Sequence, residues 1–147
     1  DDSWMLDLWQ NTLVRQHLGG IVPLSQIKVR FEAMLSADEH SLFYTIKARD
    51  TETAMGLISI SDYHDTGQKE LSYQLLPAYW GQNIAFACLQ SFLAFALPRL
   101  KLEGVYAETQ SANTRSVALL RRLGMQEQQR LMRFGAEQSV YYYRVPP

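Results

Sequence analysis

The sequence predicts a mixed α/β fold, in which helices pack on a mixed sheet. Two observations support this fold class. The spacing of apolar residues changes from a helical period in the first third of the chain to a period of two in the next third. Later segments alternate between the two patterns, which gives the order α-α-β-β-β-α-β-α-β-β. The 147 residues, 47% of them hydrophobic, are typical of one globular domain.

Two helices are expected first. Asp2 and Ser3 can cap a helix that ends at about Gly19, where a Gly-Gly pair stops it. Residues 23–37 carry apolar residues such as Phe31 along one side, which predicts a second amphipathic helix.

Three strands are expected next. Residues 41–48 and 54–61 show alternating patterns, and residues 49–52 form the turn between them. Residues 64–68 form a second turn, and residues 69–76 form the third strand, which a proline ends.

The second half of the chain alternates helix and strand. Residues 82–97 predict a helix that is apolar nearly all round and is therefore expected to be buried on most sides. Residues 105–109 predict a short strand, and residues 113–123 a helix that a glycine stops. Residues 126–134 and 140–145 predict a closing antiparallel pair.

Composition excludes several classes of partner. The net charge of −1 gives no electrostatic basis for binding nucleic acid or an anionic membrane. The longest apolar run, residues 84–97, is too short to span a bilayer, and no signal peptide is recognised. The single Cys88 excludes an internal disulfide, favours a cytoplasmic location and is expected in the core. The three histidines lack metal-ligand spacing, so no metal is expected.

The segment Leu75–Ala85 carries the clearest chemical signal. A strand ends there, a tight loop follows and a helix begins, so unpaired N–H groups and the positive end of the helix dipole meet at one point. Gly81, Asn83 and Ala85 are small or tolerate positive φ, which suits a phosphate-binding loop. The same pattern also occurs in turns that bind nothing.

This segment and its neighbours resemble the GNAT acetyltransferase superfamily, in particular the branch that includes the ribosomal-protein N-terminal acetyltransferases. The resemblance covers about Ala54 to Met125. Its motifs are Glu70–Leu75 for the family's fourth strand, Pro77–Ala85 for its pyrophosphate loop, and Asn113, Ser116, Leu119, Leu120, Gly124 and Met125 for its second cofactor motif.

The resemblance implies one GNAT domain over residues 1–147, with a mostly antiparallel sheet flanked by helices and a splayed central strand pair. It implies that the third strand bulges near Leu75–Leu76, that pantetheine of acetyl-CoA lies in the gap beside it, and that an N–H of Leu75 or Leu76 binds the acetyl carbonyl. The implied cofactor-binding residues are Leu75, Leu76, Gly81, Gln82, Asn83, Ile84, Ala85, Asn113 and Ser116.

The implied reaction is direct attack of a primary amine, either a small molecule or a protein N-terminus, on acetyl-CoA. Glu70 is the first candidate for the general base and Glu108 the second. The alternative for each is an ordinary strand residue whose carboxylate faces solvent. Ser116 is the candidate donor to the sulfur, with a helix-surface hydroxyl as the alternative. Asn113 can cap its helix as well as bind pantetheine. The family often forms homodimers.

Two departures from the family pattern leave a second hypothesis open. Asn83 replaces the loop's central glycine, and Leu120 replaces a tyrosine that often serves as general acid. These residues favour a degenerate domain that binds acyl-CoA or a protein partner without turnover. Arg121 and Arg122 either reach the 3′-phosphate of CoA or are ordinary C-terminal helix charges.

Overall fold

A computed structural model of the chain describes residues 41–47, 54–64, 66–81 and 83–146. The two helices expected over residues 2–19 and 23–37, and the turn expected over residues 49–52, lie outside the described residues.

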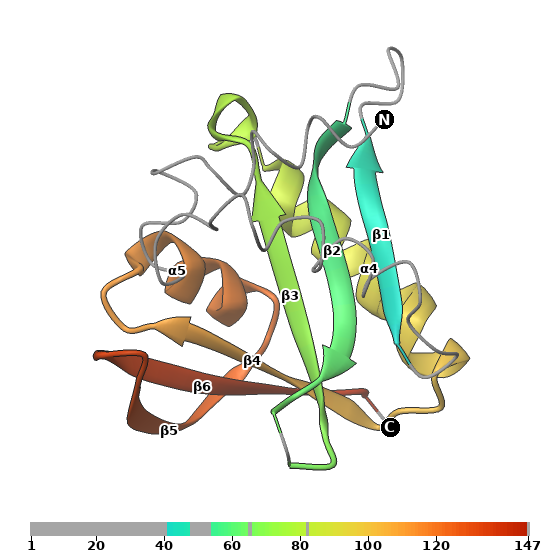
Figure 1. Cartoon of the computed structure of the whole chain (residues 1–147). Helices are drawn as coiled ribbons and strands as arrows, with labels where there is room; N and C mark the ends of the chain where they lie inside the picture. Colours follow the sequence, from blue (N-terminus) through green and yellow to red (C-terminus); the bar gives the residue numbers. More distant parts are fainter. Residues whose placement is uncertain (1–40, 48–53, 65, 82, 147) are drawn as a thin grey trace, which may run out of the picture.

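A six-stranded sheet forms the centre of the molecule, in the order β1-β2-β3-β4-β6-β5 (Figure 1). Its pairs are antiparallel except for β3 and β4, which run parallel. The strands are β1 Leu42–Lys47, β2 Ala54–Asp62, β3 Lys69–Leu75, β4 Gly104–Gln110, β5 Gln126–Arg133 and β6 Ala136–Arg144; the helices are η1 Pro77–Tyr79, α4 Ile84–Arg99 and α5 Thr114–Arg122. The mixed, mostly antiparallel sheet expected from the sequence is confirmed.

The closing hairpin is tighter than the sequence predicts. β6 begins at Ala136, four residues earlier than expected, and Arg133 pairs directly with Ala136. Phe134 and Gly135 between them have φ of 55° and 75°. Two consecutive residues with positive φ form the two-residue turn that matches strand twist, so pairing starts at once.

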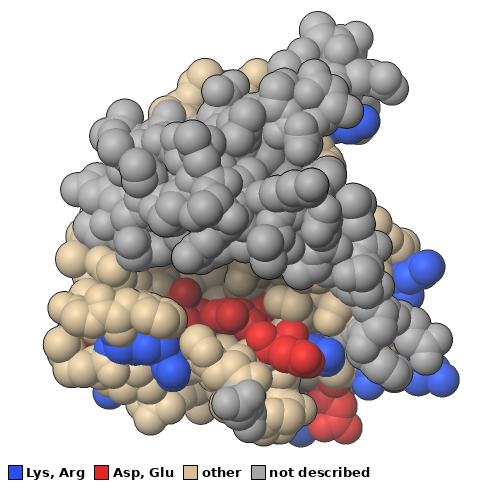
Figure 2. Space-filling view, in the orientation of Figure 1, with Lys and Arg blue, Asp and Glu red and all other residues tan. Residues whose placement is uncertain are grey.

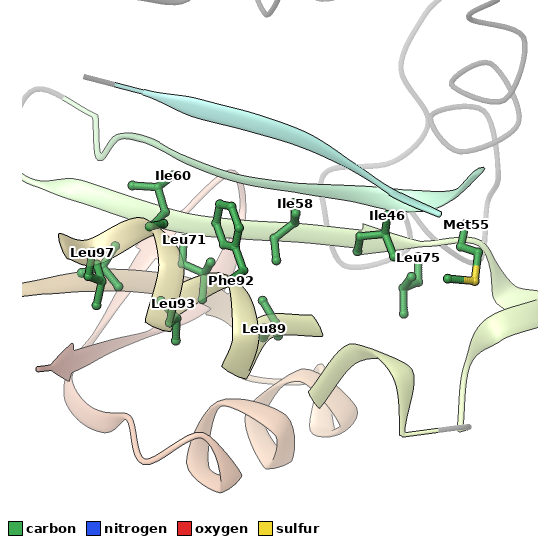
Figure 3. Close-up of a cluster of buried hydrophobic side chains, with 12 residues drawn as sticks. Ile46, Met55, Ile58, Ile60, Leu71, Leu75, Leu89, Phe92, Leu93 and Leu97 are labelled. Atoms are coloured by element: carbon green, nitrogen blue, oxygen red, sulfur yellow. The ribbon is translucent and has the colours of Figure 1, made fainter. Parts of the chain in front are cut away.

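Helix α4 covers one face of the sheet and supplies five of the twelve buried residues of the main core. In Figure 3 its Leu89, Phe92, Leu93 and Leu97 point toward side chains of the strands, and all four are buried. The expectation that α4 is buried on most sides is wrong. Gln90, Ser91 and Phe95 lie on an exposed side, because α4 is an outer layer and packs on the sheet with one side only.

The centre of the sheet opens between β3 and β4. β3 pairs with β2 continuously from Lys69 to Leu75, but it pairs with β4 only at Glu70 and Tyr106. The expected splay is therefore present. The bulge expected near Leu75–Leu76 is not, since the register with β2 does not shift between Lys69 and Leu75. The strands separate because β3 follows β2 while β4 follows β6.

Candidate active site

A cleft of about 450 Å³ lies where β3 and β4 separate. Alternate residues of a strand point to opposite faces. Tyr73 and Leu75 face α4, whereas Ser72, Gln74 and Glu108 belong to the opposite face, yet all five line the cleft. The gap in the sheet is thus lined from both faces, so two reactants can reach one point from opposite sides.

The loop between η1 and α4 has the backbone that its sequence predicts. Gly81 has φ of 74°, and Asn83, at the N-cap of α4, has φ of 61° with no side-chain cap on the helix. The first N–H groups of a helix have no partner within it, and they carry the positive end of its dipole. Gly81, Asn83, Ile84 and Ala85 line the cleft. Gln82 lies outside the described residues.

Side chains from α5 and the loop itself hold this region in place. The indole Nε1 of Trp80 donates to the Leu75 carbonyl at 2.9 Å. The guanidinium carbon of Arg115 lies 3.7 Å from the centre of the Trp80 ring. Arg122 lies 3.9 Å over the Phe86 ring and donates to the Asn83 side chain. Two cations that line the cleft therefore stand beside the loop.

The two arginines of the sequence pair separate in space. Arg122 turns toward the loop, whereas Arg121 lies 3.8 Å from the Glu127 carboxylate, on the side of β5. Of Arg121 and Arg122, only the latter lines the cleft.

Backbone donors at the end of β3 are divided between two sides. The N–H of Leu76 donates to the Met55 carbonyl at 2.8 Å, so the expected role of this N–H as donor to an acetyl carbonyl is wrong. Antiparallel strands bond with alternate residues. The N–H of Leu75 consequently points away from β2, toward the gap.

The second cofactor motif, which includes Asn113 and Ser116, contacts β3 through hydroxyl groups. Asn113 caps α5 by accepting the Ser116 N–H at 3.2 Å, and the Ser116 Oγ lies 2.8 Å from the Tyr73 hydroxyl. All three residues line the cleft. Burial raises the pKa of Tyr73, which keeps its hydroxyl protonated. Leu120 is 1% exposed and packs in the core.

Glu70 lies on the face of the sheet that points away from α4, and it is not among the residues that line the cleft. Burial and the neighbouring charge of Glu108 raise the pKa of Glu70 to about 7, while Arg133 acts in the opposite direction. A carboxylate with such a pKa can accept a proton near neutral pH. On the face shown in Figure 2, which is turned away from α4, acidic side chains gather in a hollow.

Glu108 is the centre of a buried polar cluster. Its side chain is 5% exposed. Oε1 accepts from the Tyr63 hydroxyl at 2.6 Å, and Oε2 accepts from Nε of Arg133 at 2.8 Å. His64 Nε2 lies 3.8 Å from Oε1. Sequence reasoning missed Tyr63, Arg133 and Tyr73, because each meets its partner only through long-range folding.

Other reactive side chains play no part in this arrangement. Cys88 is partly buried against the main core, as expected, and burial raises the pKa of its thiol. Among the described residues, no three His, Cys, Asp or Glu side chains gather as metal ligands do. None of the described helices has the length and hydropathy needed to cross a membrane. Gln74 Oε1 is buried, and within the part of the chain that the structure describes it has no hydrogen-bond partner.

Comparison with known proteins gives consistent results. The sequence model of a family described as "Acetyltransferase (GNAT) domain" matches residues 1–126. An uncharacterised N-acetyltransferase of Bacillus licheniformis is 24% identical over 134 residues, which cover 87% of this chain and 75% of that protein.

Solved structures share the fold at low sequence identity. A GNAT-family acetyltransferase from Bacillus anthracis superposes with a TM-score of 0.82 at 16% identity, over 97% of this chain and 89% of that one. The spermidine N-acetyltransferase of Vibrio cholerae, solved with CoA and spermine, superposes with a TM-score of 0.81 at 14% identity, over 97% and 88% of the two chains.

Proposed function

Since this chain belongs to the GNAT acetyltransferase family, we propose that it transfers the acetyl group of acetyl-CoA to a primary amine by direct attack. The observation that carries the proposal is the cleft between β3 and β4, which is lined from both faces of the sheet. It allows cofactor and amine to approach one point from opposite sides, and holding two reactants in line is the main requirement of this reaction.

We assign the α4 and α5 side of the cleft to acetyl-CoA. Its pyrophosphate binds the N–H groups of Asn83, Ile84 and Ala85, because these amides begin α4 and carry the positive end of its dipole. Arg122 supplies a positive charge beside them. Pantetheine extends along the gap toward Asn113.

The thioester then lies beside the end of β3. The Leu75 N–H, which points to the gap, donates to the acetyl carbonyl and stabilises its oxygen as negative charge develops there. Gln74 Oε1, which is buried and has no hydrogen-bond partner among the described residues, accepts an N–H of the amine or of pantetheine.

The amine approaches from the face that carries Glu70. Its nitrogen forms a bond to the acetyl carbon, and its proton passes to Glu70 directly or through one water. The carbon–sulfur bond breaks and its electron pair stays on sulfur. Ser116 and Tyr73 donate hydrogen bonds to this thiolate, which is stable near neutral pH because thiols have a pKa of about 8.5.

The acceptor is an alkyl amine of either of two kinds. A polyamine is one, suggested by the similarity to a spermidine N-acetyltransferase. A protein N-terminus is the other, suggested by the resemblance of Pro77–Ala85 to the ribosomal-protein branch. We further propose that the chain acts as one domain, as a homodimer and in the cytoplasm, the last on the basis of its single cysteine.

The test is amine-dependent release of the CoA thiol from acetyl-CoA, with spermidine and an N-terminal peptide in parallel. The proposal expects thiol and acetylated amine in equal amounts with one of them, and mass spectrometry identifies the product. If acetyl-CoA binds but no amine in a broad panel releases thiol above the enzyme-free rate, the chain is a binding domain without turnover.

A further inference from the structure

Glu70 and Glu108 lie close together at the base of the gap. β3 and β4 are in register at Glu70 and Tyr106, and Glu108 is two residues beyond Tyr106. Paired residues share a face, and so do residues two apart on one strand, so both carboxylates lie on the face away from α4.

Glu108 is held so that it cannot serve as a mobile base. Both of its oxygens accept hydrogen bonds, from Tyr63 at 2.6 Å and from Arg133 at 2.8 Å. To move toward an amine, Glu108 would have to give up at least one of these bonds inside a site where its side chain is only 5% exposed.

We propose that Glu108 is a positioning residue: Tyr63 and Arg133 hold its carboxylate in place, and its fixed negative charge faces Glu70, which takes the proton of the attacking amine. This inference rests on the proposed function and deepens it. It removes Glu108 from the candidate bases and gives Arg133, on the β5–β6 hairpin, an opposing influence on the same site.

The electrostatics of the described residues agree with this division of roles. Burial raises the pKa of Glu70 most, the charge of Glu108 raises it further, and Arg133 lowers it. Tyr63 acts on Glu70 only as a neutral phenol, since burial first and the bond to Glu108 second raise its pKa. Lys69, the residue before Glu70, is paired with Asp62 at 2.6 Å.

The experiment compares the pH dependence of kcat/KM in three variants. Glu108→Gln removes the negative charge, so the acid limb should move to lower pH by about one unit. Arg133→Gln removes the positive charge, so the limb should move to higher pH. Glu127→Gln is the matched control, because it also removes a carboxylate bonded to an arginine Nε, at 2.7 Å from Arg130, and it should leave the limb in place.

If Glu108 has only a structural role, Glu108→Gln will lower the rate without moving the acid limb of the pH profile, or the limb will move in the same direction in Glu108→Gln and Arg133→Gln. Either result overturns the inference. Tyr63→Phe removes one hydrogen bond and no charge, so it should leave the limb within about half a unit. This variant and Arg133→Gln keep the test open if Glu108→Gln does not fold.

A second readout needs no turnover, so it separates failure of this inference from failure of the proposed function. The difference in unfolding midpoint between proteins with and without Glu70→Gln is followed against pH, which reports the titration of Glu70 together with the groups coupled to it. The same difference is measured in the Glu108→Gln background. The inference expects the titration at lower pH there; an unchanged titration contradicts it even if an active amine is found.

Discussion

The Tyr73 hydroxyl lies 2.8 Å from the Ser116 Oγ, and this contact joins β3 to α5 in the wall of the cleft. Leu120 of α5 occupies the position at which the family often has a general-acid tyrosine. Leu120 is 1% exposed and cannot donate a proton. The hydroxyl pair supplies a donor from a different strand, so the leucine does not by itself indicate a degenerate domain.

Loss of either hydroxyl should slow the reaction. Ser116→Ala should lower kcat by about 10- to 10²-fold, because one hydrogen bond to a charged group contributes about 1.5–3 kcal/mol. Tyr73→Phe should have an effect of similar size, and the double variant should cost less than the product of the two, since the pair acts as a unit. Thr114→Ala, which removes an exposed hydroxyl from the same helix, is the control. A rate within twofold of wild type in Ser116→Ala would assign leaving-group stabilisation to solvent.

Acetyl-CoA should raise the unfolding temperature, because a ligand that binds only the folded state stabilises it. Gly81→Glu should abolish this shift by placing bulk and negative charge in the phosphate-binding loop. Gly67→Glu is a matched control, since Gly67 has nearly the same φ, 76° against 74°, and open space around it, but lies in the β2–β3 turn. An unchanged shift in Gly81→Glu would remove the loop from the cofactor site.

Glu70→Gln tests the general base. It should lower kcat by about 10²-fold near neutral pH, because the amide cannot accept the amine proton, and leave acetyl-CoA affinity nearly unchanged. Glu103→Gln, at an exposed residue just before β4, controls for the loss of one carboxylate. Steady-state kinetics and calorimetric titration with acetyl-CoA give the two quantities. A normal rate throughout the acid limb would exclude Glu70 as the base.

The same substitution should make stability depend on pH in a definite direction. The pKa of Glu70 is raised to about 7 in the folded state from 4.5, so the folded state binds this proton more tightly than the unfolded state. The unfavourable contribution of Glu70 is therefore absent below the lower value and complete above the higher one. Glu70→Gln should be more stable than wild type at about pH 8, by up to about 3 kcal/mol, and about equally stable near pH 4. Urea unfolding at both pH values measures the difference; a variant less stable at the higher pH would contradict the raised pKa.

The sequence predicts those parts of the site that depend on neighbouring residues. Gly81 and Asn83 predict a loop with positive φ before a helix, and both residues have positive φ in the structure. Asn113 has the spacing of an N-cap and forms that cap. These features depend on backbone preferences within a few residues, which a single sequence carries.

The polar cluster around Glu108 could not be predicted in this way. Tyr63 is 45 residues from Glu108 in the chain, and Arg133 is 25 residues away. Their contact depends on how β3, β4 and β6 order themselves in the sheet, and no local pattern encodes that order. The exposed side of α4 could not be predicted for a related reason. An apolar composition does not say which side of a helix another layer covers.

A crystal structure of the chain with acetyl-CoA tests the central claim most directly. The account predicts the pyrophosphate on the amides that begin α4, pantetheine between β3 and β4, and the acetyl oxygen within about 3 Å of the Leu75 N–H. Glu70 should face the acetyl carbon from the opposite side of the sheet. Density for the cofactor on another surface, with the cleft between β3 and β4 empty, would contradict the account. An acetyl oxygen that lies away from the Leu75 N–H would also contradict it.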